Sequence, residues 1–230
     1  MSCFITIEGG EAVGKSTQLR LLSKNLKECN FDVYSTKEPG GTKIGEAVRD
    51  VMLSEMVSDP ITEMFLLSAS RRENVKVIKK HLKEGKIVLC DRYIDSSIAY
   101  QVTVKKGDSE VISKIIEYST ENLIPDLTII LDLAPEIAMK RIALSAAHKS
   151  VYDMQACDFH SKVRAAFLDI YEKNRNMRKI MLVDSAQSID VVSDIIIKEA
   201  VNLINELRTL NAPFLKQEKS SLKDRSISVS

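Results

Sequence analysis

The chain has 230 residues, and its 33 Lys and Arg side chains nearly balance its 32 Asp and Glu, which gives a formal net charge of +1 at pH 7. The length suits one domain with a sizeable core, and the balanced charge lacks the positive field expected of a protein that binds nucleic acid or an anionic membrane. No basic leader precedes an apolar segment, and no apolar run approaches the ~18 residues of a membrane span. We therefore expect a cytoplasmic protein without a nucleic-acid or membrane partner.

Short apolar runs alternate with longer segments in which apolar residues recur at helical spacing, as Leu19, Leu22 and Leu26 do. This alternation is typical of an α/β protein built on a parallel sheet. We predict a helix after each of five strands, which are expected at residues 3–7, 31–36, 87–91, 127–133 and 180–183.

Three further signals delimit the elements. Gly85 is a suitable left-handed cap for a long helix at 61–84, and Pro135 can begin the helix that follows the fourth strand. From residue 211 onward the sequence is rich in serine and charge. We expect one domain at 1–210 and a flexible tail at 211–230.

The four cysteines, Cys3, Cys29, Cys90 and Cys157, are widely spaced and include no C-x-x-C pair. Two of them lie in apolar strand runs. We expect reduced thiols in the core or at the surface.

Residues 9–16 fit the pattern G-x-x-x-x-G-K-[ST] and lie between a predicted strand and a predicted helix. In such a loop, backbone N–H groups and a helix N-terminus surround phosphate oxygens. Lys15 reaches the β- and γ-phosphates, and the Ser16 hydroxyl can bind Mg²⁺. The residues expected to bind ATP in this segment are Gly9, Gly10, Glu11, Ala12, Val13, Gly14, Lys15, Ser16 and Thr17.

The third predicted strand ends in Asp91 and Arg92. Ligands of open α/β sheets bind at the carboxyl ends of the strands, where Asp91 can orient Mg²⁺ through water and Arg92 can stabilise a phosphoryl group in transfer. We therefore predict that Lys15, Asp91 and Arg92 are catalytic and that Ser16 and Asp91 serve the metal. A surface ion pair is the alternative interpretation of Asp91 and Arg92.

Residues 91–101, Asp-Arg-Tyr-Ile-Asp-Ser-Ser-Ile-Ala-Tyr-Gln, resemble the D-R-Y-x-x-S-x-x-A-Y-Q segment of bacterial thymidylate kinases, a family of P-loop nucleoside monophosphate kinases. Four other segments resemble that family in the same order: the P-loop with its internal acid, Glu-Pro-Gly-Gly-Thr at 38–42, Ser-Ala-Ser-Arg at 68–71, and Pro-Asp-Leu-Thr at 125–128. The resemblance extends over about residues 3–208.

The resemblance implies a P-loop NTPase fold of three layers, with helices flanking a five-stranded parallel sheet and a short lid at about 143–153. It implies transfer of the γ-phosphoryl group of Mg-ATP to dTMP, giving dTDP and ADP for dTTP biosynthesis. It also implies a homodimer packed through helices, with the helix at 61–84 as a candidate.

The resemblance assigns roles to single residues. Arg71 would bind the dTMP phosphate, Arg92 would bridge donor and acceptor phosphates, and Arg141 would stack on adenine, although a helix-surface charge is the alternative for Arg141. Glu11 would lie near the acceptor sugar and the metal, unless it is a solvated loop carboxylate. Ser97 and Gln101 would meet the thymine edge, and a loop at 38–39 would frame the pocket. The expected dTMP-binding residues are Glu11, Glu38, Pro39, Leu67, Arg71, Arg92, Ser96, Ser97, Tyr100 and Gln101.

The chain departs from the family pattern in its lid. The P-loop has no arginine, and Ser-Val-Tyr-Asp at 150–153 stands where the family commonly has a D-R-x-E-like segment. Basic charge must then come from His148, Lys149 or Arg164, or is absent. Because one preorganised donor contributes on the order of 10²–10³ in rate, a slow enzyme is one expectation.

Two further departures concern the acceptor side. Leu67 stands where the family commonly has a stacking phenylalanine, and Phe65 would point elsewhere on the helix. Residues 102–106 replace a glycine-rich segment, so we expect a shorter or differently shaped loop there.

These departures leave alternatives open. One is a nucleotide kinase of different or broader acceptor specificity, and another is a degenerate nucleotide-binding module with an impaired lid. A GTPase-like switch is disfavoured because the sequence has neither N-K-x-D nor the D-x-x-G switch.

Overall fold

The computed structural model describes residues 1–54, 59–145 and 150–225, with side chains described up to residue 210. Its strands are β1 (Cys3–Glu8), β2 (Val33–Lys37), β3 (Ile87–Asp91), β4 (Leu127–Asp132) and β5 (Ile180–Asp184). The helices are α1 (Lys15–Glu28), α2 (Lys43–Ser54), α3 (Pro60–Lys83), α4 (Ile94–Ser97), the π-helix η1 (Ile98–Val104), α5 (Ser109–Thr120), α6 (Pro135–Leu144), α7 (Cys157–Asn174) and α8 (Ile189–Arg225).

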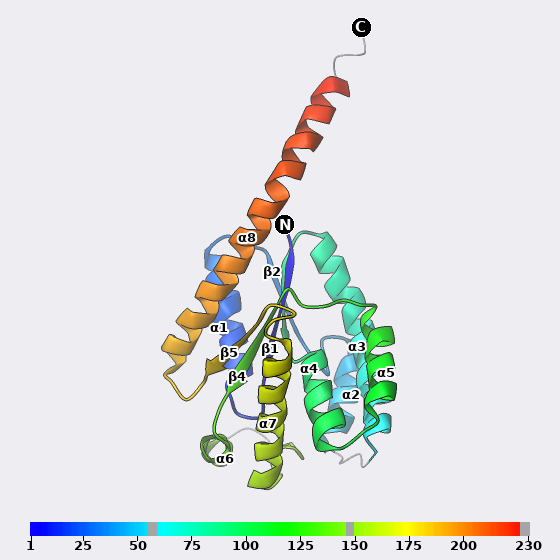
Figure 1. The fold of residues 1–230 in the computed structure, drawn as a ribbon, viewed down its shortest axis with the longest axis vertical. Coiled ribbons are helices and arrows are strands. Elements are labelled where there is room, and N and C mark those ends of the chain that lie inside the picture. The colour runs from blue at the N-terminus through cyan, green and yellow to red at the C-terminus, as the bar shows by residue number, and fades with distance from the viewer. Residues whose placement is uncertain (55–58, 146–149, 226–230) are drawn as a thin grey trace.

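The five strands form one parallel sheet in the order β2-β3-β1-β4-β5, with β1 at the centre. Side chains alternate across a strand, so Ile5 and Ile7 join the apolar cluster that α1 and α8 cover, whereas Phe4 packs on the opposite face with α3. Helix α7 and η1 cover the β4 side of that second face. The predicted three-layer α/β fold is therefore confirmed (Figure 1).

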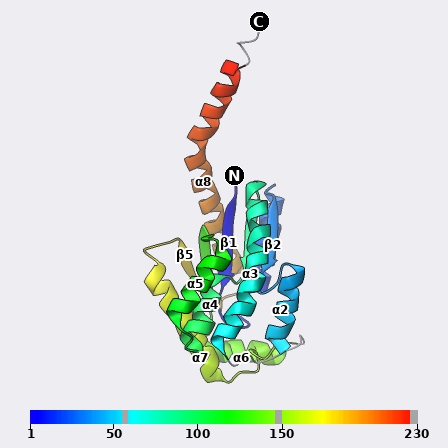
Figure 2. The same ribbon diagram turned by 90° about the vertical axis from the view of Figure 1, so that its right-hand side faces the viewer.

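The predicted strands all form, and their ends differ from the expected ones by at most two residues. The long predicted helix is α3, which Asp59 begins by accepting a 2.6 Å hydrogen bond from the Thr62 N–H. Gly85 follows α3 with φ +83°, as expected of a left-handed cap. Figure 2 shows α2 alongside α3, with both helices reaching the carboxyl edge of the sheet.

Two segments differ from expectation. Helix α8 continues to Arg225 (Figure 1), so the backbone of residues 211–225, in the segment expected to be a flexible tail, is helical. The segment contains three Lys and two Leu, which favour helix, and extending the helix that precedes it avoids the cost of nucleation. Its flexibility stays a prediction. Residues 102–104, expected as part of a loop, instead complete η1.

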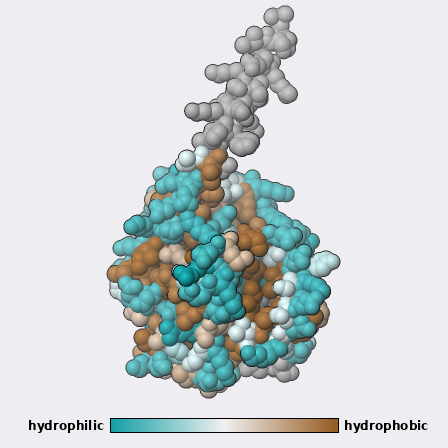
Figure 3. Space-filling view, viewed as in Figure 1, coloured by the Kyte–Doolittle hydropathy of each residue, from teal (hydrophilic) through white to brown (hydrophobic). Residues whose placement is uncertain are grey.

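The four cysteines are distributed as expected from the sequence, between the core and the surface. Cys3 and Cys90 are buried, Cys29 and Cys157 are exposed, and all four are free. Apolar and hydrophilic residues alternate over the face in Figure 3. Within the described ranges, no helix is both long and apolar enough to cross a bilayer.

Replacing Ile5 by Ala tests how far the central strand stabilises the fold. Ile5 is fully buried between Leu89 of β3 and Leu127 of β4, so Ile5→Ala should lower the free energy of unfolding by about 2–5 kcal/mol in urea titrations. The control is Ile44→Ala on α2, whose side chain is 54% exposed and should change stability by no more than about 0.5 kcal/mol. Similar losses in both variants would contradict this description of the core.

Candidate active site

The loop between β1 and α1 has a backbone that only glycine accommodates at two positions. Gly9 and Gly14 have φ of +133° and +97°, and a Cβ on Gly9 would lie 2.5 Å from the Leu131 carbonyl oxygen. Helix α1 begins at Lys15, whose ammonium group donates to the Gly10 carbonyl. The predicted phosphate-binding loop is therefore formed, with a helix N-terminus facing its hollow.

The end of β3 meets this loop at the carboxyl edge of the sheet. The Ser16 hydroxyl donates a 2.6 Å hydrogen bond to Asp91 Oδ2. The Arg92 guanidinium donates to the Gly9 carbonyl at 2.9 Å and to Glu11 Oε1 at 3.0 Å. The structure therefore brings the predicted catalytic and metal-binding residues together, and the interpretation of Asp91 and Arg92 as a surface ion pair is wrong.

The Glu11 carboxylate is enclosed by positive and hydroxyl donors. Its side chain is 9% exposed and accepts hydrogen bonds from Arg92 and, at 2.6 Å, from the Tyr100 hydroxyl, with His160 Nδ1 at 3.7 Å. Burial alone would raise the pKa of Glu11, but His160 and the charges of Arg92 and Lys15 lower that pKa to about 2. Glu11 is thus an ionised part of the site rather than a solvated loop carboxylate.

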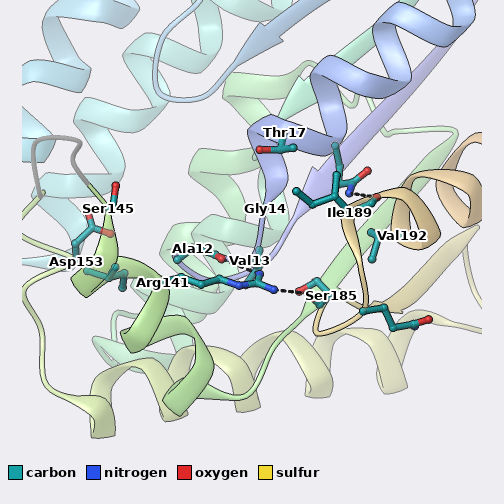
Figure 4. Close-up of a pocket in the computed structure, with 13 residues that line it drawn as sticks. Ala12, Val13, Gly14, Thr17, Arg141, Ser145, Asp153, Ser185, Ile189 and Val192 are labelled. Carbon is teal, nitrogen blue, oxygen red and sulfur yellow. Dashed lines mark hydrogen bonds between the residues drawn. The ribbon is translucent and has the colours of Figure 1, made fainter.

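A cavity of about 480 Å³ lies beside the P-loop, and we call it the Arg141 cavity (Figure 4). Arg141 of α6 reaches across its wall and donates to the Ala12 carbonyl at 3.2 Å and to the Ser185 carbonyl at 2.9 Å. This anchoring makes a freely solvated helix-surface charge the wrong interpretation of Arg141. The lining residues are Ala12, Val13, Gly14, Thr17, Gln18, Arg141, Ile142, Ser145, Asp153, Ser185, Gln187, Ile189 and Val192.

A second cavity, of about 340 Å³, opens on the other side of the P-loop, and we call it the Arg71 cavity. Lys15, Ser16 and Asp91 form its P-loop end. All ten residues that were expected to bind the acceptor line this cavity: Glu11, Glu38, Pro39, Leu67, Arg71, Arg92, Ser96, Ser97, Tyr100 and Gln101. Phe65 is 60% exposed and points away from it, as expected. The peptide bond between Glu38 and Pro39 is cis.

Arg71 is held deep in the wall of its cavity by three partners. Its Nε donates to Glu38 Oε2 at 2.7 Å, and its Nη2 donates to Ser97 Oγ at 3.0 Å and to the Tyr93 carbonyl at 3.2 Å. Nη1 is buried without a hydrogen-bond partner among the described residues. Burial raises the pKa of Glu38, and Arg71 opposes that effect. These contacts join Arg71 to Ser97, a residue expected at the base, and not to the P-loop.

Several lining residues were not anticipated from the sequence. Arg49 of α2 donates to the Pro39 carbonyl at 3.2 Å, and Met52 and Leu53 line the cavity from the same helix. Their i, i+3 and i+4 spacing after the loop at 38–42 was the available signal. Tyr152 and Asp153 were known only as departures from the family pattern, yet Asp153 lines both cavities.

The proposed sources of lid charge have different outcomes. His148 and Lys149 lie outside the described residues. Arg164 makes a bidentate pair with Asp132 at the end of β4, with distances of 2.7 and 2.9 Å. Because this pair occupies its Nε and Nη2, the Arg164 side chain does not extend into the described part of the lid.

A P-loop flanked by two cavities, with a lysine, an arginine and a carboxylate at the junction, defines the class of protein. Such a site suits a P-loop phosphotransferase that binds two small molecules.

Comparison with known proteins identifies the family. The thymidylate kinase family model matches residues 7–196. A thymidylate kinase of Clostridium novyi (strain NT) is 40% identical over 194 residues, which cover 82% of this chain and 93% of that protein. One from Acholeplasma laidlawii (strain PG-8A) is 40% identical over 197 residues, covering 84% and 96%. The crystal structure of thymidylate kinase from Ehrlichia chaffeensis superposes with a TM-score of 0.69 at 33% identity, covering 86% of this chain and 98% of that one. The chain belongs to the thymidylate kinase family.

Removing the Arg71 side chain should destabilise the fold because it leaves the Glu38 carboxylate buried without its counter-charge. Arg71→Leu is expected to lower the free energy of unfolding by about 3–5 kcal/mol. The neighbouring Arg72, whose side chain is 42% exposed in its ion pair with Glu121, provides the control, since Arg72→Leu should cost no more than about 1 kcal/mol. Chemical denaturation of both variants checks this, and equal losses would mean that the buried pair contributes no more than a surface pair.

Proposed function

We propose that this protein transfers the γ-phosphoryl group of ATP to the phosphate of dTMP, giving dTDP and ADP for dTTP biosynthesis. The observation that carries the proposal is the convergence of ten acceptor-side residues on the Arg71 cavity, whose P-loop end contains Lys15, Ser16 and Asp91. ATP then occupies the Arg141 cavity with its phosphates in the P-loop, and dTMP occupies the Arg71 cavity.

In this arrangement Lys15 and Arg92 supply the positive charge at the transferred phosphoryl group. Lys15 lies at the N-terminus of α1, and Arg92 is held from two sides by Gly9 and Glu11. Such fixed donors stabilise charge without reorganising as the reaction proceeds. Because catalysis of phosphoryl transfer consists mostly of positioning and charge stabilisation, Lys15 and Arg92 make the protein's main electrostatic contribution to the transition state.

The residues at the junction fit Mg²⁺. The Ser16 hydroxyl and the Asp91 carboxylate are 2.6 Å apart and offer only oxygen atoms, which Mg²⁺ prefers while it keeps water and substrate phosphates as further ligands. Ser16 would hold the ion directly and Asp91 would orient its water. When bound, Mg²⁺ neutralises phosphate charge.

On the acceptor side, we assign Arg71 to the thymine ring rather than to the dTMP phosphate, which revises the expectation from the sequence. Its unpartnered Nη1 and its bond to Ser97 support a donor for a ring carbonyl. Arg92, which contacts the P-loop, then serves the acceptor phosphate. The Glu11 charge discourages phosphate from entering at its position.

The lid favours slow turnover over loss of the reaction. The lid positions within the described residues, 143–145 and 150–153, include no basic side chain. A basic residue would contribute on the order of 10²–10³ in rate, whereas the P-loop, Arg92 and both cavities are in place.

We also propose a cytoplasmic homodimer that packs through α3 and its neighbour α5. These helices contact each other and carry Phe65, Val111 and Tyr118, which are 60%, 41% and 82% exposed. Sedimentation equilibrium of the protein and of a Phe65→Asp variant tests this arrangement, because the charge should favour the monomer. Unchanged association would locate the interface elsewhere.

The first experiment is ADP formation with Mg-ATP and, in parallel, dTMP, dUMP, CMP, AMP, GMP and thymidine. Selective turnover of dTMP is expected. Binding of dTMP without turnover would favour a degenerate nucleotide-binding module instead, and comparable turnover of several acceptors would favour a kinase of broader specificity.

Lys15→Ala should lower kcat by about 10²-fold or more, because the ammonium group meets charge that moves in the transition state. Lys24→Ala is the matched control on the same helix, since its side chain is 67% exposed in a surface pair. Thermal unfolding should change little in either variant. If kcat falls equally in both, or in neither, the assigned role of Lys15 is wrong.

The assignment of Arg71 can be tested with a ligand that lacks phosphate. Arg71→Lys keeps a positive charge near Glu38 but loses the planar fork, so it should weaken binding of thymidine and dTMP by the same factor, about tenfold. Arg92→Lys is the converse control and should weaken binding of dTMP alone. Calorimetry with both ligands decides, since an effect of Arg71→Lys confined to dTMP would return Arg71 to the phosphate.

A further inference from the structure

Glu63 is a fully buried carboxylate to which the proposed reaction assigns no role. It lies in the first turn of α3 and is 0% exposed. Three side chains from separate segments donate hydrogen bonds to its carboxylate. They are Gln101 of η1, whose Nε2 lies 2.8 Å away, Tyr152 of the lid, whose hydroxyl lies 3.1 Å away, and Lys105, which follows η1. A buried carboxylate with this many donors is fixed in position.

This contact determines which end of the Gln101 amide the cavity can use. The Glu63 carboxylate accepts from the Lys105 ammonium group through one oxygen and from the NH₂ group of the Gln101 amide, at 2.8 Å, through the other. Gln101 is 3% exposed and lines the Arg71 cavity. Its carbonyl oxygen therefore remains as the polar atom that it offers to a ligand.

An acceptor at Gln101 complements the donor at Arg71. Nη1 of Arg71 is buried without a hydrogen-bond partner in the described part of the chain, and Ser97 Oγ links Arg71 to η1 through its 3.0 Å bond. A donor beside an acceptor matches a ring in which an N–H adjoins a carbonyl, as in thymine and uracil. Cytosine presents the reverse, a ring-nitrogen acceptor beside an amino donor, and leaves both protein groups unpaired.

We propose that Glu63 is a specificity-determining positioning residue that fixes the Gln101 amide so that the acceptor cavity selects a base with a ring N–H and rejects cytosine. The inference rests on the proposed function, because it concerns base selection at that same site. Glu63 acts through Gln101 and does not itself touch the substrate.

Tyr152 of the lid also helps to fix the position of the Glu63 carboxylate. Tyr152 donates to Glu63, its ring meets the Tyr100 ring edge-on at a centroid distance of 5.8 Å, and Lys105 lies 5.5 Å from its centroid. Burial raises the pKa of Tyr152, and Glu63 adds to that effect, so the hydroxyl keeps its proton and donates. The backbone N–H of Val151 also donates to the Leu53 carbonyl at 3.2 Å, which holds this part of the described chain against α2.

Glu63→Gln tests the proposal directly, because a carboxamide can either donate to or accept from Gln101 and no longer fixes it. The ratio of kcat/KM for dTMP to kcat/KM for dCMP should fall by about tenfold or more, the scale on which an unpaired polar group is rejected. The change should lie in KM for dTMP, while KM for ATP stays constant. Glu73→Gln, on the same helix but in a surface pair with Lys76, is the matched control and should leave the ratio unchanged. An unchanged ratio in folded Glu63→Gln enzyme would overturn the proposal.

A double-mutant cycle separates positioning from a merely structural role. If Glu63 acts through Gln101, then Glu63→Gln should have no further effect on the ratio in a Gln101→Leu background. An equal effect in both backgrounds would overturn the proposal.

Glu63→Asp covers the case in which Glu63→Gln fails to fold, since it keeps the charge beside Lys105 but withdraws the carboxylate from the Gln101 amide by one methylene. A fall in the ratio supports the proposal, and an unchanged ratio overturns it. Failure of this inference is distinguishable from failure of the proposed function. If the proposed function fails, the unmodified protein does not phosphorylate dTMP. If only the inference fails, the unmodified protein phosphorylates dTMP and the variants have the same selectivity as the unmodified protein.

Discussion

The Arg92 guanidinium links three segments of the site, namely the end of β3, the P-loop and α4. It follows β3 directly, and it contacts the Gly9 carbonyl, the Glu11 carboxylate and the Ser96 hydroxyl. Because β1 and β3 are adjacent and parallel, the P-loop and the Asp-Arg segment leave the sheet at the same edge, within reach of one another. The left-handed backbone of Arg92, with φ +67°, is a conformation that non-glycine residues keep only where their surroundings fix it. Both cavities depend on this junction, because Arg92 lines the Arg71 cavity and also holds the P-loop that borders the Arg141 cavity.

The charges around Arg92 prepare the junction for a polyanion. Burial, and next the charge of Arg92, lower the pKa of Lys15 to about 8, whereas burial, and next the charge of Asp95, raise that of Glu8 to about 7. The pKa of Glu11, unlike that of Glu8, is lowered, to about 2. Two cations that repel each other in a region of low dielectric gain most when an anion lies between them. Burial and the charge of Arg92 thus disfavour the Lys15 cation, and under the proposed function the phosphate groups of the substrates would offset that cost.

Much of this arrangement could be predicted from the sequence, because it depends on local patterns. The P-loop pattern, the strand runs and Gly85 each define a backbone conformation within a few residues, and all formed as expected. The family resemblance also identified ten acceptor-side residues, and all ten line the Arg71 cavity. Contacts between distant segments were less accessible: nothing local to Arg71 indicates that Ser97 lies against it, and Glu63 has no signature of its own. Helix α8 passed residue 210 because continuing a helix is easier than starting one.

The lid illustrates why a departure from a family pattern does not by itself indicate lost function. Judged as a source of charge, residues 150–153 are deficient, since a valine and a tyrosine occupy the stretch where basic charge was sought. Judged by their contacts, the same residues join α2 through Val151 and α3 through Tyr152, and Asp153 borders both cavities. A lid that binds the acceptor-side helices can exclude water and position the acceptor without adding charge to the transition state. Positioning and charge contribute separately to phosphoryl transfer, so in the proposed mechanism this lid supplies the first contribution and leaves the second to Lys15 and Arg92.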